Sequence, residues 1–211
     1  MILWYLARGA GIAAFASLSL ATGLGALTAR STAGAPSASR ARAVEHRVVW
    51  QYMHRAAALV GVTLIVLHVA TLLADPYADV GVRGLLPFGA GYRPLAVTFG
   101  VLAAYLLVAV VVTGLLRGRM ARSVAGARRW RYVHVTAYLA WATSAWHFLQ
   151  AGTDAGTWWG LAVLFAGTAV VGGGVTARLL GLGPAEPGRS VDGADARPPL
   201  VRERTLIGAS R

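Results

Sequence analysis

Residues 54–68 read HRAAALVGVTLIVLH, an apolar segment with a histidine at each end. An imidazole inside a membrane-spanning helix is costly, and it usually marks a functional site facing the interior of a helix bundle. A second segment of the same kind, HVTAYLAWATSAWH, occupies residues 134–147. These two segments decide both the fold and the function that the sequence predicts.

The composition of the 211-residue chain indicates an integral membrane protein. Hydrophobic residues make up 56% of the chain, charged residues only 13%, and the mean hydropathy is +0.58. Soluble domains rarely carry so few charges. The absence of cysteine excludes disulfides, haem attachment through cysteine and cysteine-ligated iron–sulfur clusters. All 20 basic residues are arginine, which together with the high alanine and glycine content indicates a GC-rich bacterial gene.

Five apolar segments are each long enough to cross a bilayer, which takes about 20 helical residues. Their apolar runs are continuous and do not alternate with polar residues, so helices are expected rather than strands. We therefore predict an all-α protein of the cell membrane, a bundle of five transmembrane helices, with a mobile tail at 181–211. The predicted spans are 4–29, 48–74, 95–116, 132–150 and 158–180.

The arginines predict the orientation of the bundle. Seventeen of the 20 lie in the 30–55 connection, in the 117–131 connection or beyond residue 177. Because arginine-rich connections stay in the cytoplasm, we expect the N-terminus outside and the C-terminus inside. The arginines form no single basic face, so no nucleic-acid partner is expected. As an alternative, the first span could be a signal peptide, because LTA at 27–29 resembles a cleavage site.

Four of the five histidines lie in the second and fourth spans. One helix separates these spans, so they run in the same direction, and each histidine shares its depth with one on the other span. The spacings of 14 and 13 residues both put about 20 Å between the two depths. Two neutral imidazoles at one depth can supply both axial ligands of a haem iron. The pattern predicts two non-covalent haems b, with His54 and His134 as metal ligands at the cytoplasmic depth and His68 and His147 at the outer depth.

The fourth span poses a geometric problem. Thirteen residues leave His134 and His147 about 140° apart around an ideal helix. A π-bulge, or a kink near Thr143–Ser144, would bring both rings to one face. Alternatively, the two haems lie at different angles to this helix.

Three further residues are candidate cofactor contacts. Arg55 and Arg131 flank the inner histidine pair, where they could neutralise haem propionates or simply extend to the membrane surface. Gly61 lies midway between the histidines of its span, where it could admit a flat ring or serve ordinary helix packing. Trp141 lies midway on the other histidine span, and we expect it to pack in the core rather than to line an electron path.

The residues outside the spans are expected to have simpler roles. The 75–94 loop is predicted to cover the outer histidine pair as a lid. His46 is expected to be solvated. The sequence contains no nucleophile–base pair or carboxylate dyad, so no catalytic residue is assigned. Three aspartates are expected to be solvated loop residues, with contact to a cationic or ferric acceptor as the alternative: Asp75, Asp79 and Asp154.

The pattern H-x13-H, followed two spans later by H-x12-H, resembles the ferric reductase-like transmembrane domain. The segment DPYADVGVRGLLPFGAGYRPL at 75–95 is similar to the outer loop of small actinobacterial members. That superfamily includes the membrane part of NADPH oxidases and the haem subunit of methionine sulfoxide reductase systems. The resemblance covers about residues 45–180, and it implies the same four histidine ligands in a haem-binding domain at 1–180. Larger relatives have two spans before the first histidine helix, whereas this chain has one.

We therefore predict a membrane b-type cytochrome that relays electrons to an outer acceptor, surrounded by membrane lipid. No flavin or nicotinamide domain is recognisable, so a separate flavoprotein or quinol is the expected donor, and the chain would be one component of an oxidoreductase. Three alternatives are open. The chain could be the haem subunit of a periplasmic flavin- or molybdopterin-containing reductase, a membrane protein that uses histidines for proton or ion passage, or a structural protein without a cofactor.

Overall fold

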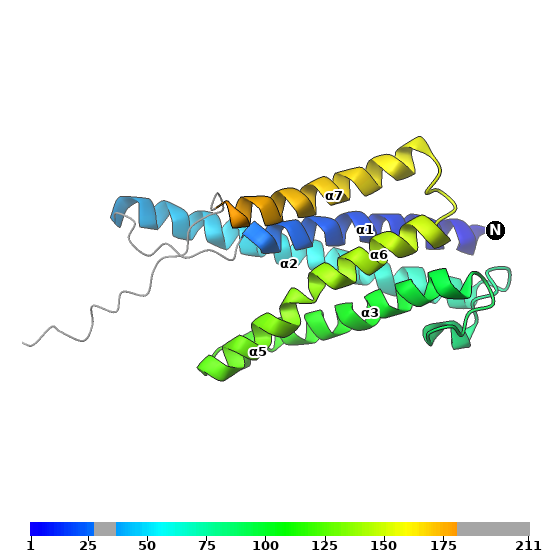
Figure 1. The fold of residues 1–211 in the computed structure, drawn as a ribbon, viewed down its shortest axis with the longest axis horizontal. Coiled ribbons are helices and arrows are strands. Elements are labelled where there is room, and N and C mark those ends of the chain that lie inside the picture. The colour runs from blue at the N-terminus through cyan, green and yellow to red at the C-terminus, as the bar shows by residue number, and fades with distance from the viewer. Residues whose placement is uncertain (28–36, 181–211) are drawn as a thin grey trace, which may run out of the picture.

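The computed structural model describes residues 1–27 and 37–180. Within these ranges every regular element is a helix and no strand forms, which confirms the predicted all-α class (Figure 1). The predicted tail at 181–211 and the last two residues of the first predicted span lie outside the described residues.

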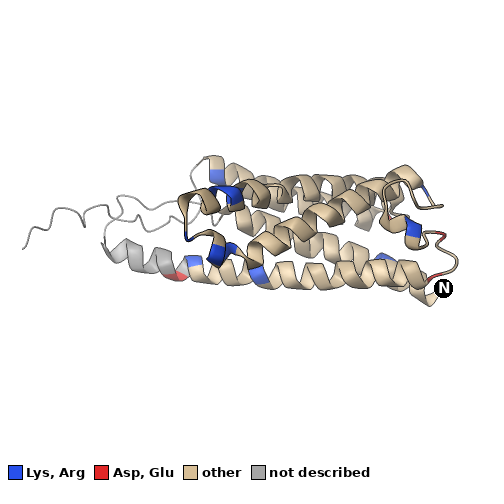
Figure 2. Ribbon diagram, turned by 90° about the horizontal axis from the view of Figure 1, so that it is seen from below, with Lys and Arg blue, Asp and Glu red and all other residues tan. Residues whose placement is uncertain are grey.

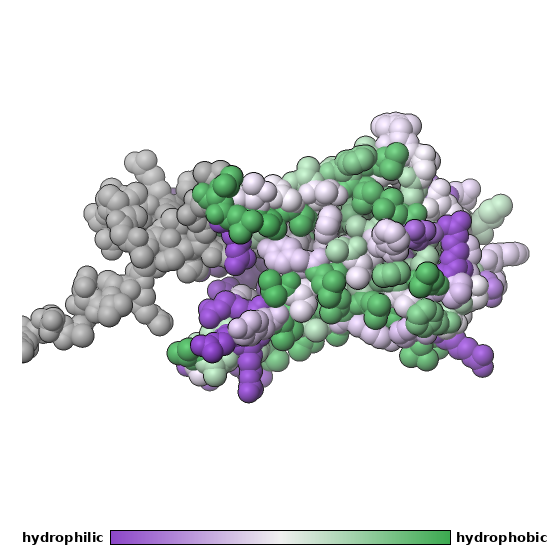
Figure 3. Space-filling model, in the orientation of Figure 1, coloured by the Kyte–Doolittle hydropathy of each residue, from purple (hydrophilic) through white to green (hydrophobic). Residues whose placement is uncertain are grey.

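Four helices in the described ranges are long and apolar enough to cross a membrane. Their central surfaces expose large apolar side chains, such as Val66 (64%), Val108 (61%) and Phe165 (68%), which suits contact with lipid. In Figure 3 apolar side chains cover much of the middle of the visible face, and hydrophilic ones gather at its ends. The four spans are α1 (Ile2–Leu27), the Arg47–Ala74 part of α2 (Ser37–Ala74), α3 (Pro94–Leu115) and α7 (Trp158–Leu179).

The remaining predicted span, 132–150, is divided between two shorter helices, α5 (Val124–Val135) and α6 (Ala137–Ala151). Thr136 separates them, because its N–H bonds the carbonyl of Val133, three residues back, instead of continuing the four-residue pattern. The chain thus has four candidate spanning helices, and α5 and α6 stand in place of the fifth. The interruption precedes the predicted position, and α6 continues as an α-helix through Thr143–Ser144.

Local sequence explains where several helices begin. Ser123 caps α5 by accepting a hydrogen bond from the Gly126 N–H, and Thr157 caps α7 in the same way from Gly160. Pro94 opens α3, where its missing N–H is no loss. Two short elements, η1 (Val82–Leu85) and α4 (Arg117–Met120), lie in the connections on either side of α3.

The helices form two groups. In the α1 group, α1 packs on α2 and α7; in the α3 group, α3 packs on α5 and α6; contacts between α1 and α6 join them. α2 runs parallel to α5 and α6, as predicted, and antiparallel to the other long helices (Figure 1). The N-terminus and the 75–93 loop lie at one end, the N-terminal end. Most arginines gather at the other, the arginine-rich end (Figure 2).

The closest approach between α1 and α7 depends on glycine. A Cβ atom on Gly174 would lie 2.6 Å from the carbonyl oxygen of Gly23, and one on Gly23 would lie 2.7 Å from that of Val170. Side chains at these positions would force the two backbones apart. Small residues at such crossings are typical of helix packing in membranes, where close van der Waals contact replaces hydrophobic burial.

Replacing Gly174 by Leu should therefore push α7 away from α1 and lower the free energy of unfolding by about 1–3 kcal/mol. Gly173→Leu is the matched control, because a Cβ atom at Gly173 meets nothing within 4 Å. Unfolding of both variants in mixed micelles, followed by circular dichroism, measures the difference. Equal loss of stability in the two variants would contradict a specific role for the α1–α7 contact.

Candidate functional site

The structure brings the four span histidines together in the two predicted pairs. The ring centres of His54 and His134 lie 6.2 Å apart at the arginine-rich end, and their planes cross at 64°. Those of His68 and His147 lie 6.4 Å apart at the N-terminal end and cross at 78°. α2 is continuous between its two histidines, so about 21 Å of helix rise separates the two pairs.

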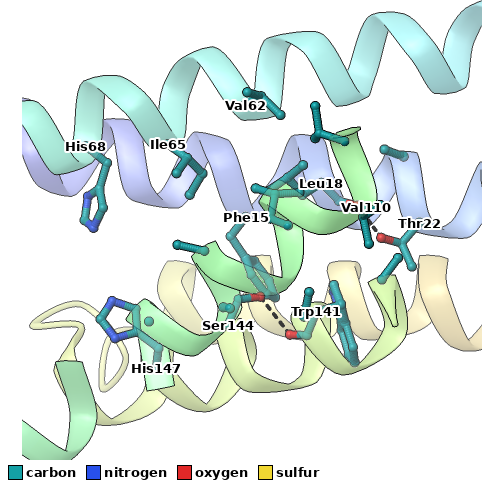
Figure 4. Close-up of a pocket in the computed structure, with 18 of the residues that line it drawn as sticks. Phe15, Leu18, Thr22, Val62, Ile65, His68, Val110, Trp141, Ser144 and His147 are labelled. Carbon is teal, nitrogen blue, oxygen red and sulfur yellow. Dashed lines mark hydrogen bonds between the residues drawn. The ribbon is translucent and has the colours of Figure 1, made fainter. Parts of the chain in front are cut away.

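A cavity of about 1310 Å³ connects the two pairs, and all four histidines line it. This volume exceeds the about 300–1,000 Å³ of a pocket for a single drug-sized ligand. Figure 4 shows His68 and His147 reaching toward one another from facing helices. Trp141 lies between the two layers, where its ring stacks near Phe15 and its Nε1 donates to Ser19 Oγ over 2.9 Å. This agrees with the expected packing role of Trp141.

Main-chain carbonyl oxygens of a neighbouring helix hold three of the four imidazoles. Because a carbonyl oxygen can only accept, each Nδ1 carries the hydrogen and each Nε2 keeps its lone pair. A ring fixed in this way presents one open nitrogen, which is the arrangement usual for histidines that bind a metal. We call these bonds the carbonyl contacts: His54 Nδ1 to Ala21 O at 2.7 Å, His68 Nδ1 to Ala7 O at 2.7 Å, and His147 Nδ1 to Ala96 O at 2.9 Å.

A glycine stands four residues after each of these carbonyls, directly against the histidine ring. In a helix, the carbonyl of one residue points toward the residue four positions later, so a side chain there would crowd the oxygen. Glycine leaves the oxygen open to the ring. A Cβ atom would lie 2.9 Å from the His68 ring at Gly11, 3.2 Å from the His54 ring at Gly25, and 2.8 Å from the His147 ring at Gly100.

His134 is the exception. The Val110 carbonyl and Gly114 stand beside its ring in the corresponding positions, but a Cβ atom on Gly114 would be 3.8 Å away. The Nδ1 atom of His134 is buried and has no hydrogen-bond partner in the described part of the chain. The ring instead stacks on Trp130, with centres 5.0 Å apart, and the Arg117 guanidinium lies 4.9 Å from the centre of the Trp130 ring.

Two helix hairpins share this plan. In each, the first helix carries two glycines 14 residues apart, and the second carries the two histidines that face them. The hairpins read G-x13-G with H-x13-H, from α1 and α2, and G-x13-G with H-x12-H, from α3 and α5–α6. Sequence reasoning missed the glycine pairs. Their spacing equals that of the His54–His68 pair, and this match was the available signal.

The other sequence candidates lie at different places. Gly61 is not among the residues that line the cavity; a Cβ atom there would lie 2.7 Å from Leu18, so packing of α2 on α1 accounts for this glycine. Arg55 and Arg131 line the cavity at the arginine-rich end and are exposed. Arg117 and Arg178, which sequence reasoning did not single out as cofactor contacts, line the same end. The side chain of His46 lies outside the described residues.

The expected solvation of the aspartates holds for Asp79 alone, which is exposed. Asp75 and Asp154 are each only 5% exposed, so the prediction is wrong for both. The Asp154 carboxylate accepts hydrogen bonds from Arg8 through both oxygens, with Nε to Oδ2 at 2.9 Å, and so ties α1 to the connection before α7. Several residues of the predicted 75–94 lid, among them Ala78 and Tyr92, line the cavity.

The ring spacing fits a single metal ion between each pair of imidazoles. A bond of about 2.0 Å to nitrogen, plus about 1.1 Å from nitrogen to ring centre, predicts about 6.2 Å between the centres of two opposed rings. The observed distances are 6.2 and 6.4 Å. In the described residues no third histidine, cysteine or carboxylate joins either pair as a ligand group. A metal there would need further ligands from a non-protein group, as in bis-histidine haem.

No protein-family model, curated protein or solved structure matches the chain. The functional argument therefore depends on the paired rings, the carbonyl contacts and the shared cavity.

The Arg8–Asp154 pair provides a test of how the N-terminal end is held together. Asp154→Asn should lower the free energy of unfolding by about 1–3 kcal/mol, because Arg8 loses a partly buried, two-point partner. Asp79→Asn, in an exposed carboxylate of the same end, should change it by less than about 0.5 kcal/mol. Thermal unfolding in detergent compares them, and a similar effect from both would contradict a stabilising role for the pair.

Proposed function

We propose that the protein is a membrane b-type cytochrome that passes single electrons from one side of the membrane to the other. His54 and His134 would hold one haem b, and His68 and His147 the second. The observation that carries the proposal is the spacing of the two ring pairs, 6.2 and 6.4 Å, within one cavity. When bound, each haem supplies an iron centre that cycles between ferric and ferrous states.

The chain's own groups would hold and orient these cofactors. The carbonyl contacts keep three ligand rings in one tautomer and at one angle, so little reorganisation is needed on binding. Apolar side chains make up most of the cavity lining and exclude water from it. Phe15 and Trp141 occupy the space between the two histidine layers, so they would separate the cofactors at a set distance.

The proposed direction of transfer follows from the charge distribution. The arginine-rich end would face the cytoplasm of a bacterial cell and receive electrons from a separate flavoprotein or quinol. The N-terminal end would face outward, toward the acceptor or a reductase partner. α1 supplies the carbonyls for both histidines of α2, which supports its retention in the mature protein rather than removal as a signal peptide.

Membership of the ferric reductase-like superfamily is part of the proposal, and the four-histidine pattern supports it. The rival function, proton passage along histidines, needs both nitrogens of each ring to exchange protons. Three of the four rings have one nitrogen committed to a carbonyl, which favours metal ligation over a proton relay.

The purified, haem-supplemented protein should show reduced-minus-oxidised bands of b type and two haems per chain. His54→Ala and His134→Ala should each remove one and the same haem, and His68→Ala and His147→Ala the other. Pyridine haemochrome assay counts the haems, and electron paramagnetic resonance distinguishes them. Because the ring planes cross at 64° and 78°, both ferric signals should be strongly anisotropic low-spin signals. A colourless protein after reconstitution would refute the proposed function.

A substitution at Gly11 tests whether the glycines admit the ligand rings. Gly11→Ala should place a methyl group against the His68 ring and remove most of the haem at the N-terminal end, while the other haem stays. Gly9→Ala is the control on the same helix, because a Cβ atom there meets nothing within 4 Å, and it should keep both haems. Retention of both haems in Gly11→Ala would contradict this role.

A further inference from the structure

We infer that the site formed by His54 and His134 gives its haem the higher reduction potential of the two, so that an electron comes to rest at the arginine-rich end. The inference rests on the proposed function, because it concerns the two haems which that function requires. Two independent features of the chain carry it: the hydrogen bonds of the ligand rings, and the distribution of charge between the two ends.

The ligand rings at the two ends are held differently. At the N-terminal end both rings, His68 and His147, donate Nδ1–H to a carbonyl. At the arginine-rich end only His54 does so, because Nδ1 of His134 has no partner. A hydrogen bond from Nδ1–H makes an imidazole a stronger electron donor to its metal. Stronger donation stabilises ferric iron, so the fully bonded N-terminal pair favours the lower potential.

The spacing along the chain explains the missing bond. The two acceptor positions on α3, Ala96 and Val110, are 14 residues apart, whereas His134 and His147 are only 13 apart. With about 1.5 Å of rise per residue, one ring falls short of its carbonyl when the other is in place. The three-residue hydrogen bond at Thr136, next to His134, lengthens this segment only in part.

The charges act in the same direction. Reduction adds negative charge to the haem, so nearby positive charge raises its potential. Haem b brings the same two propionates to either site, so the protein's own charges make the difference. Three arginines face three aspartates at the N-terminal end: Arg8, Arg83 and Arg93 with Asp75, Asp79 and Asp154. Among side chains described at the other end, nine arginines face one acid: Arg47, Arg55, Arg117, Arg119, Arg122, Arg128, Arg129, Arg131 and Arg178 with Glu45.

Arg117 links the two features. Its guanidinium lies over the Trp130 ring, which in turn stacks on the His134 imidazole, and it lines the cavity. A positive charge therefore stands close to the one ligand ring that lacks a carbonyl contact. Arg119, two residues further along, is exposed and does not line the cavity, so it provides a matched comparison.

This order of potentials has a consequence for electron flow. An electron delivered from the arginine-rich side would be held at the first haem until an outer acceptor draws it onward. If that side is cytoplasmic, the negative interior potential of a cell membrane favours outward movement of the electron and offsets part of the uphill step. The pair would thus store one electron on the donor side and release it when the membrane is energised or the acceptor is oxidised.

Potentiometric titration of the full-length, haem-loaded protein in lipid vesicles, followed by visible absorbance, tests the inference. The wild-type chain should show two one-electron waves. The higher wave should disappear in His54→Ala and His134→Ala, and the lower wave in His68→Ala and His147→Ala. Loss of the lower wave in His134→Ala, or two waves at one potential, would overturn the inference while leaving the proposed function intact.

Arg117→Gln keeps all four ligands and so guards against misfolding of the histidine variants. It should shift only the higher wave, toward lower potential, with both haems still bound, whereas Arg119→Gln should shift neither wave. A shift of the lower wave alone in Arg117→Gln, or equal shifts in the two variants, would overturn the inference. Absence of any bound haem in the wild-type chain would instead refute the proposed function.

Discussion

The hydrogen bond from a histidine Nδ1 to a main-chain carbonyl of the neighbouring helix is the contact on which this structure depends. A helix carbonyl already accepts one bond within its own helix, and it can accept a second only if nothing covers it. Glycine four residues later keeps it uncovered, as at Gly11, Gly25 and Gly100. The same three contacts join helices, orient the imidazoles and leave Nε2 open toward the cavity.

Because the contact is made within each helix hairpin, the two hairpins can be built alike and still face one another across a large space. α1 supports the rings of α2, and α3 supports those of α5 and α6. Neither hairpin needs the other to orient its histidines. The cavity between them can therefore stay open for a cofactor without loss of order in the residues around it, an arrangement typical of preorganised sites.

The second hairpin also shows what one residue changes. Its histidines are 13 apart where its glycines are 14 apart, so the two sets cannot both be in register on continuous helices. The helix is interrupted at Thr136, and His134 rests on Trp130 instead of a carbonyl. The site at the arginine-rich end is thus chemically different from its partner, although each is made of two imidazoles at nearly the same distance.

The sequence alone determined the helical class, four spans to within a few residues, the parallel course of the two histidine segments and the identity of the histidine pairs. These follow from the length of apolar runs and from helix rise, which are properties of one segment at a time. Only the tertiary structure decided that Gly61 packs against Leu18 while Gly11 admits an imidazole, that Asp154 is buried against Arg8, and that the interruption falls at Thr136. Each depends on which face of a helix meets which neighbour, and spacing along a single segment does not specify that.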